Sequence, residues 1–267
     1  MSQFLHLLNS NTSALPADFW VPSTSRLKPE HAWLYALGYS KKIKEYLDAT
    51  VEVYYKDIYN IATYRGGSNI FENGPAWEDA LTEGKGWSYG AEFSARSTWG
   101  PLSASVAYTL SRTWRQFDVL NNGDPFPYRY DRRHNLGLEL IYARKKRFNA
   151  IASWTYMSGE AITLPDQVYP DFDNNLLGNP VSSAPTYHYS ARNNYRLPPV
   201  HRLDVAFNFI RQRGSRFQRT WTLGLFNAYA QKNIMVVDLV QDEPGKYSLR
   251  GLSVFQCIPT ISYSVKF

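Results

Sequence analysis

The sequence predicts an all-β protein, an antiparallel up-and-down transmembrane β-barrel with about nine long strands. Three observations support this fold class. Apolar and polar residues alternate with period two along most of the chain, and no stretch shows a convincing 3.6-residue period. Short links alternate with long ones between the alternating segments. Aromatic residues make up 16% of the 267 residues, an unusually large share.

Composition excludes several other classes of protein. With 44% hydrophobic residues the chain is too apolar for a disordered protein. Its longest apolar run, 32–37, is far shorter than the ~18 residues that a membrane-spanning helix requires. Cys257 is the single cysteine, which excludes an intramolecular disulfide. The net charge of +6 comes from scattered basic residues, so we expect no nucleic-acid partner.

The alternation defines the expected strands. In 102–111, Leu102, Val106 and Leu110 share one face, and Ser103 and Ser105 share the other. The last two segments are treated as single long strands, the first of them with an irregularity near residues 227–233. The expected strands are 32–43, 47–64, 84–99, 102–117, 132–144, 148–158, 200–212, 217–241 and 246–267.

Short and long links alternate along the chain between these strands. Four links are short, and they lie at 43–47, 99–102, 144–148 and 212–217. Three alternate links are long, and they lie at 65–83, 118–131 and 159–199. This arrangement predicts tight turns on one rim and long loops on the other. If the carboxyl terminus lies on the periplasmic side, all the tight turns face the periplasm.

A membrane barrel explains the two strand faces better than the alternative, a soluble β protein. Strands of soluble proteins usually span about five or six residues, whereas these are longer. The apolar face suits contact with outer-membrane lipid, and the aromatic residues recur near strand ends, as interfacial girdles do. The other face carries charges of both signs that suit a wet lumen: Glu52, Lys56, Glu92, Arg96, Glu139, Arg202 and Asp204.

The last strand carries an assembly signal. Ile261, Tyr263, Val265 and Phe267 alternate with polar residues, and the chain ends on the aromatic Phe267. This pattern resembles the terminal strand that the barrel-assembly machinery reads, which we therefore expect as a partner. The alternative is an ordinary final strand.

Several phrases resemble the carboxy-terminal barrel of TonB-dependent outer-membrane receptors, particularly those of Bacteroidetes. They follow the family's order and cover essentially the whole chain. The phrases are LPADFWVPSTSRLKPEHAWLYALGY (15–39), EVYYKDIYN (52–60), YTLSRTWRQF (108–117), YRYDRRHNL (128–136), PPVHRLDVAFNF (198–209) and LGLFNAYAQKNI (223–234).

The resemblance implies a function and a larger parent protein. Family barrels have 22 strands around a plug, so nine strands are too few, and we expect residues 1–267 to be the carboxy-terminal portion of the barrel, without plug domain and signal peptide. The parent would be integral to the Gram-negative outer membrane and import a carbohydrate, peptide or metal chelate, energised by the TonB complex through the plug. We expect no enzymatic activity and no cofactor. A passive porin or structural barrel, and then an outer-membrane hydrolase, are the alternatives.

Two groups of polar and aromatic side chains are candidate sites. Rings beside polar groups in the outer loops suit ligand capture, and the alternative is a solvated loop without a binding role. These residues are Arg129, Tyr169, Phe172, Tyr187, Tyr189, Arg192 and Tyr195. The inward charges are expected to face the plug or lumen water, or to neutralise one another; these are Glu92, Arg96, Glu139, Arg202 and Asp204. We expect no catalytic residue, because Ser88 in GWSYG lacks the strand–turn–helix context of a hydrolase nucleophile. Asp171, Asp173 and Asn175 offer oxygen ligands for calcium, but the glycine and distal Glu of a known calcium loop are missing, so we expect no metal site.

Overall fold

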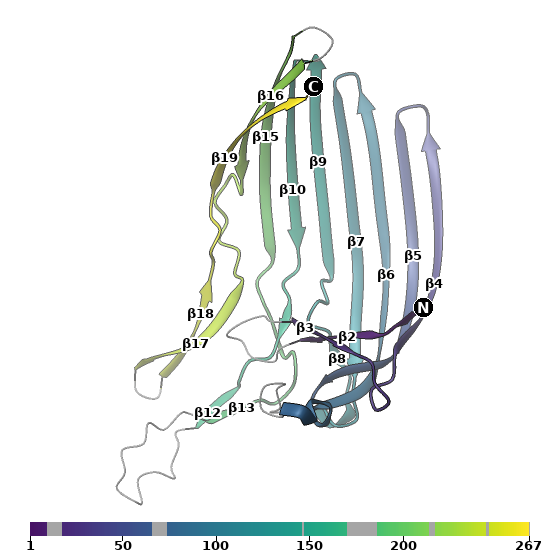
Figure 1. Cartoon of the computed structure of the whole chain (residues 1–267), viewed down its shortest axis with the longest axis vertical. Coiled ribbons are helices and arrows are strands. Elements are labelled where there is room, and N and C mark those ends of the chain that lie inside the picture. The colour runs from purple at the N-terminus through teal and green to yellow at the C-terminus, as the bar shows by residue number, and fades with distance from the viewer. Residues whose placement is uncertain are drawn as a thin grey trace, which may run out of the picture.

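The computed structural model describes residues 1–9, 18–65, 74–145, 147–169, 186–213, 217–243 and 246–266. One large, curved antiparallel sheet dominates these residues (Figure 1), which confirms the predicted all-β fold class. Nine of its described strands have nine or more residues. They are β4 (Glu30–Ile43), β5 (Leu47–Tyr64), β6 (Leu81–Trp99), β7 (Leu102–Gln116), β9 (His134–Lys145), β10 (Phe148–Met157), β15 (Val200–Arg213), β16 (Phe217–Phe226) and β19 (Ile258–Lys266).

The long strands pair in the order in which they follow along the chain, β4-β5-β6-β7-β9-β10-β15-β16-β19. The short links between β4 and β5, β6 and β7, β9 and β10, and β15 and β16 lie at one end of the sheet, where β19 also ends (Figure 1). We call this end the turn rim and the opposite end the loop rim. The predicted up-and-down meander is therefore confirmed.

The irregularity predicted near residues 227–233 is confirmed, but the prediction that 217–241 and 246–267 each remain a single strand is wrong. β16 ends at Phe226, and β17 (Val236–Glu243) pairs only with β18 (Lys246–Leu252), whereas β19 returns to β16. The break follows from Asn227, which is fully buried and has a φ of 53°. Its side-chain Nδ2 donates to the carbonyls of Gln231 (2.9 Å) and Phe255 (3.2 Å). One side chain thereby fixes the interruption in both strands.

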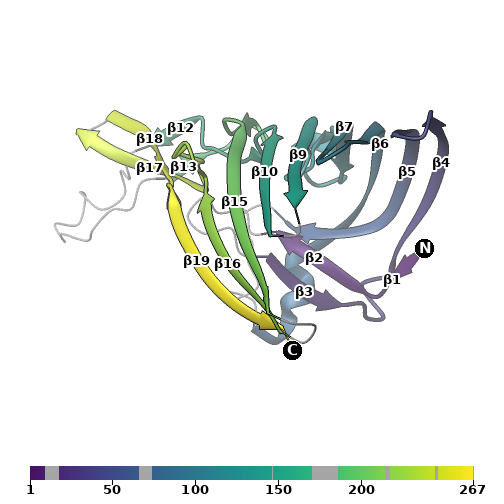
Figure 2. The same ribbon diagram turned by 90° about the horizontal axis from the view of Figure 1, so that it is seen from above.

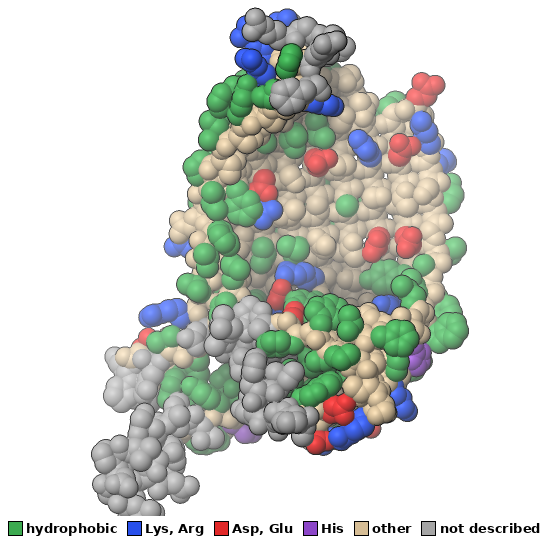
Figure 3. Space-filling model, in the orientation of Figure 1, with side chains coloured by type: hydrophobic (Ala, Val, Ile, Leu, Met, Phe, Trp, Pro, Cys, Tyr) green, Lys and Arg blue, Asp and Glu red, His purple; other side chains and the backbone are tan. Residues whose placement is uncertain are grey.

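The strand register separates a polar face from an apolar one. Ser105 on β7 lies opposite Arg96 on β6 and Glu139 on β9, whereas Tyr108 lies opposite Phe93 and Leu136. The polar face is the concave side of the sheet, where charges of both signs lie among uncharged polar groups (Figure 3). The apolar face is the convex side, as expected for a wall in contact with lipid.

Aromatic side chains on the convex face lie at two levels. On β6, Tyr89 and Trp99 are both exposed and stand ten residues apart. At ~3.3 Å per residue this is ~33 Å along the strand, which for a tilted strand matches an apolar band ~25 Å tall. Among the described residues, no helix is long and apolar enough to cross a membrane.

The sheet is open at both of its outer strands. Seen from above, it curves from β4 round to β19, and the two strands do not meet (Figure 2). Within the described ranges, β19 pairs only with β16, and β4 pairs with β5 and, at its start, with β1 (Ser2–Gln3). Most of the outer edge of β4 and that of β19 therefore carry no ladder in this part of the chain.

A hairpin formed by β2 (Leu5–Asn9) and β3 (Asp18–Pro22) lies on the concave side of the sheet at the loop rim (Figures 1 and 2). Leu8 and Val21 are buried in one cluster with Ala62 and Leu81 from the ends of β5 and β6. The sequence did not predict this hairpin, because its strands have only five residues each. Packing against the sheet holds it there.

Short elements organise the long loops at the same rim. The 3₁₀ helices η1 (Gly74–Ala80) and η2 (Asn121–Gly123) and strand β8 (Phe126–Pro127) belong to the first two loops. In the third, β11 (Ala161–Ile162) pairs with β14 (Tyr195–Arg196), and β12 (Gln167–Tyr169) pairs with β13 (Thr186–His188). The long loops are thus built from short hydrogen-bonded pieces in their described parts.

A buried carboxylate joins two of these loops to the sheet. The side chain of Asp131 is only 2% exposed. Its Oδ1 accepts the Thr113 backbone N–H at 2.8 Å, and its Oδ2 accepts Arg196 Nη2 at 2.6 Å. Arg196 also donates to the carbonyl of Gly159 at 2.9 Å. Asp131 therefore links β7, the loop after it and the loop between β10 and β15.

Leu8→Ala is expected to release the β2–β3 hairpin. Truncating a buried leucine costs about 2–5 kcal/mol, and Leu8 has no exposed surface. Hydrogen exchange of the β2 and β3 amides in the full-length receptor should accelerate accordingly. Leu5→Ala is the matched control, because Leu5 lies in the same strand but is 49% exposed. Equal protection in the two variants would contradict the proposed packing.

Asp131→Ala is expected to lower the free energy of local opening of these loops by about 2–3 kcal/mol, because it leaves Arg196 without its carboxylate. The most direct measurement is hydrogen exchange at the Thr113 amide, which loses its acceptor. Asp166→Ala should have a much smaller effect, because its ion pair with His188 is solvent-exposed. If the Thr113 amide of Asp131→Ala exchanges as slowly as in the wild type, Asp131 does not hold the loops to β7.

Candidate functional site

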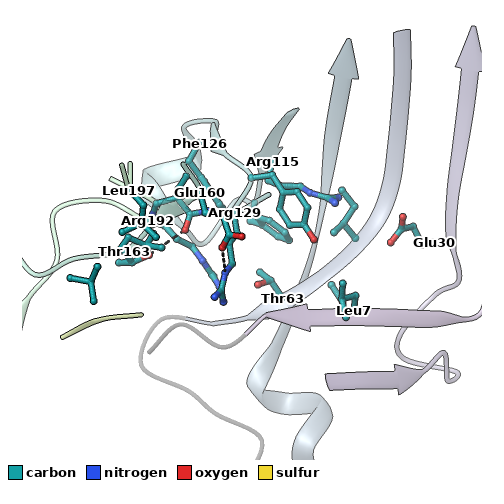
Figure 4. Close-up of a pocket in the computed structure, with 18 of the residues that line it drawn as sticks. Leu7, Glu30, Thr63, Arg115, Phe126, Arg129, Glu160, Thr163, Arg192 and Leu197 are labelled. Atoms are coloured by element: carbon teal, nitrogen blue, oxygen red, sulfur yellow. Dashed lines mark hydrogen bonds and ion pairs between the residues drawn. The ribbon is translucent and has the colours of Figure 1, made fainter. Parts of the chain in front are cut away.

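A cavity of about 230 Å³ lies at the loop rim on the concave side of the sheet (Figure 4). Its walls come from the β2–β3 hairpin, the ends of β5 and β7, and the loops that follow β7 and β10. The apolar part of the lining includes Leu7, Trp20, Phe117, Phe126 and Leu197. Segments far apart in the sequence therefore enclose one site.

Three arginines line this cavity, and their guanidinium groups have different contacts. Arg115, from the end of β7, stacks over the ring of Tyr128 with its Cζ 4.2 Å from the ring centroid. Its Nε and Nη1 are buried, and within the described part of the chain neither has a hydrogen-bond partner. A buried guanidinium N–H without an acceptor is costly, so these two donors are available to a ligand.

Arg192 is held by hydrogen bonds from both its side chain and its backbone. Its Nη1 donates to the carbonyl of Tyr64 at 3.0 Å, and its own N–H donates to Asn121 Oδ1 at 2.8 Å. Burial lowers the pKa of the Arg192 guanidinium to about 10. The group therefore keeps its positive charge at pH 7 and presents it to the cavity wall.

The third arginine, Arg129, belongs to a mixed charge cluster. Its Nε lies 3.6 Å from Glu160 Oε2, and Glu160 also pairs with Arg132. Glu30 on β4 is the other carboxylate in the lining. Three cations against two carboxylates leave the described lining with an excess of positive charge.

The polar lining contains hydrogen-bonding groups that are held in place by the loops. Asn193 donates from Nδ2 to the carbonyl of Pro127 at 2.7 Å, and its N–H bonds to Thr163 Oγ1 at 3.0 Å. Nowhere in the described ranges do three His, Cys, Asp or Glu side chains cluster as metal ligands would. Ser88 lies in the middle of β6, where its Oγ is 3.0 Å from Thr113 Oγ1. The arrangement fits a ligand with anionic groups and apolar surface.

The structure brings together two of the seven residues expected to bind ligand. Arg129 and Arg192 line the cavity. Four tyrosines do not line it and are at least 39% exposed; Tyr169 and Tyr187 belong to the β12–β13 pair, which projects away from the sheet (Figure 1). The other two are Tyr189 and Tyr195. Phe172 lies outside the described residues.

The five charged residues predicted to face the lumen share the face of the sheet that carries Arg115. Arg96 lies opposite Asp48 as well as Ser105, and Glu92 lies opposite Glu52. Glu139 occupies the same row as Arg96, and Ser153 of β10 separates it from Asp204. Arg202 Nε donates to Asp204 Oδ2 at 2.9 Å.

Of the four residues of the predicted assembly signal, three lie in β19. Ile261, Tyr263 and Val265 continue rows that contain the convex-face residues Leu223, Trp221 and Arg219. Phe267 lies outside the described residues.

Sequence reasoning missed Arg115, Glu160 and Trp20. Arg115 is an even number of residues from Ser105 and Thr113 on a strand that was predicted. The alternation alone therefore predicts that it lies on the same concave face. Its burial was not readable, because it depends on a hairpin and loops that are distant in the sequence. Trp20 and Glu160 carry no local signal of this kind.

Two solved structures are similar to this chain in fold. The ferric-catecholate import receptor Fiu of Escherichia coli K12 is 14% identical, with a TM-score of 0.51, over 91% of this chain and 28% of that one. The FrpB iron transporter of Neisseria meningitidis is 12% identical, with a TM-score of 0.49, over 91% of this chain and 31% of that one. This chain thus spans less than a third of either protein, and at such identities the likeness concerns the fold. No curated protein matches it.

A family model described as "TonB dependent receptor-like, beta-barrel" matches residues 7–229, which is well over half of the chain. Proteins of this family are integral to the outer membrane of Gram-negative bacteria, and they are transporters, not enzymes. The family predicted from the sequence phrases is therefore confirmed: this chain belongs to the TonB-dependent receptor β-barrel family.

Proposed function

We propose that residues 1–267 form the carboxy-terminal portion of the barrel of an outer-membrane receptor that imports a bulky nutrient with energy from the TonB complex. The open ladders of β4 and β19 support this, because in lipid every strand edge needs a partner. Strands from elsewhere in the receptor would pair along these edges and close the barrel. The phrases that resemble Bacteroidetes receptors support a protein of that branch.

The nutrient would bind in the cavity at the loop rim. The observation that carries this proposal is Arg115, whose buried Nε and Nη1 lack acceptors among the described residues. Oxygen atoms of the ligand would accept these N–H groups, and the rings of Trp20 and Phe126 would cover its apolar part. A carbohydrate with acidic groups, an acidic peptide or an anionic metal chelate satisfies these requirements. Tyr187, Tyr189 and the other exposed loop tyrosines would make first contact.

The other expected partners have separate places on the molecule. The concave-face charges Glu92, Arg96, Glu139, Arg202 and Asp204 would meet the plug, through which the TonB complex acts. The alternating residues Ile261, Tyr263 and Val265 of β19, together with Phe267, would be read by the barrel-assembly machinery. Outer-membrane lipid would cover the convex face.

Uptake by the full-length receptor in its native host tests this function. A strain lacking the receptor should grow poorly on at least one nutrient in a panel of carbohydrates, peptides and metal chelates. Arg115→Gln should raise the concentration for half-maximal uptake of that nutrient at least about tenfold, because one charge-assisted hydrogen bond contributes about 1.5–3 kcal/mol.

Arg112→Gln is the matched control, because Arg112 lies three residues away on β7 but opposite Tyr89 on the convex face. Its half-maximal concentration should equal that of the wild type. Uptake that continues without TonB would identify a passive pore, and identical behaviour of the two variants would remove the cavity as the binding site.

A further inference from the structure

Positive charge is concentrated on part of the turn rim. Residues 144–147 and 211–219 together contain eight of the 29 Lys and Arg and none of the 23 Asp and Glu. These segments connect β9 to β10 and β15 to β16, and β10 pairs with β15. The two basic links are therefore neighbours at one edge of the sheet.

Two of these arginines face each other on the convex surface. Arg211 on β15 lies directly opposite Arg219 on β16, and both are exposed. Directly opposite side chains have Cβ atoms about 4.5–5.5 Å apart, and like charges there are destabilising. Neither arginine forms an ion pair with any described carboxylate. The pair therefore presents two guanidinium groups to an anion from outside the chain.

Aromatic rings lie on the next row of the same face. Phe209 and Trp221 are paired across β15 and β16, and Tyr263 of β19 follows them. The rings of Trp221 and Tyr263 lie 4.7 Å apart, and all three residues are about half exposed. Aromatic rings in this position mark the boundary between hydrocarbon and headgroups, so the arginine pair lies at headgroup level.

Beyond the rings, the convex wall is hollowed. A shallow, almost wholly apolar groove of about 490 Å³ lies between β15, β16 and β19, lined by Phe207, Leu223, Leu225, Pro259 and Ile261. Leu223 stands four residues from Arg219 along β16, which is ~13 Å at ~3.3 Å per residue. An anion site, an aromatic boundary and an apolar groove thus follow one another along the same strands.

We propose that this wall is a binding site for an anionic phospholipid. The phosphate accepts hydrogen bonds from Arg211 and Arg219, the glycerol region lies beside Trp221 and Tyr263, and one acyl chain fills the groove. The inference rests on the proposed membrane-barrel function, because it needs the convex face to contact lipid. A free phosphate would leave the groove empty, and a protein partner would have to lie within the hydrocarbon layer.

Native mass spectrometry of the detergent-solubilised full-length receptor tests the site. Phosphatidylglycerol should remain bound, whereas zwitterionic phosphatidylethanolamine should bind at least about tenfold more weakly. The double variant Arg211→Gln/Arg219→Gln should lose this preference. Glycerol phosphate, which has no acyl chains, should not displace phosphatidylglycerol at equal concentration; displacement would reveal a simple anion site and overturn the proposal.

Arg144→Gln/Arg147→Gln removes the same charge from the neighbouring link and should keep the preference. Equal losses in both double variants would mean that the rim attracts lipid only by diffuse charge, which overturns the proposal. The wild-type comparison of the two lipids requires no substitution, so equal affinities overturn it even if a variant fails to assemble. Heat-modifiable migration and nutrient uptake, measured in parallel, show separately whether barrel assembly or the transport function has failed.

Discussion

In a membrane, every backbone N–H and C=O needs a hydrogen-bond partner, and this requirement governs the structure. Strands of nine to nineteen residues meet it by continuous antiparallel pairing, from β4 through to β19. Pairing in turn fixes which residues share a row, and hence the division into a polar concave face and an apolar convex one. The two open edges are the places where this requirement is still unmet in the described residues.

At the loop rim, side chains form hydrogen bonds to backbone groups that neighbouring strands would satisfy within the sheet. Asn227 bonds to the backbone where β16 ends, and Asp131 accepts the amide of Thr113 and the guanidinium of Arg196. These bonds satisfy backbone and side-chain polar groups where irregular chain lies against the sheet. The cavity depends on them, because they fix the loops that carry Arg129 and Arg192.

Period two was a reliable guide to the fold because lipid and lumen water impose it on every spanning strand. It did not show that the irregularity near 227–233 divides the segment into two strands, because that division depends on Asn227, which is buried and has a positive φ. It also failed for β2 and β3, whose position depends on Leu8 meeting Ala62 and Leu81. Arg129 and Arg192 were identified from loop composition, but the burial of Arg115 requires the tertiary structure.

The same residue type behaves differently at the two rims, and the surroundings decide how. At the loop rim, Glu160 lies against Arg129 and Arg132, so part of the cationic charge is compensated within the chain. On the convex side of the turn rim, Arg211 and Arg219 face each other without a described carboxylate beside them. Repulsion across a strand pair is tolerable when an external anion lies between the charges. Two short segments of the sequence, 144–147 and 211–219, carry eight basic and no acidic residues, and Arg211 and Arg219 lie in the second of them.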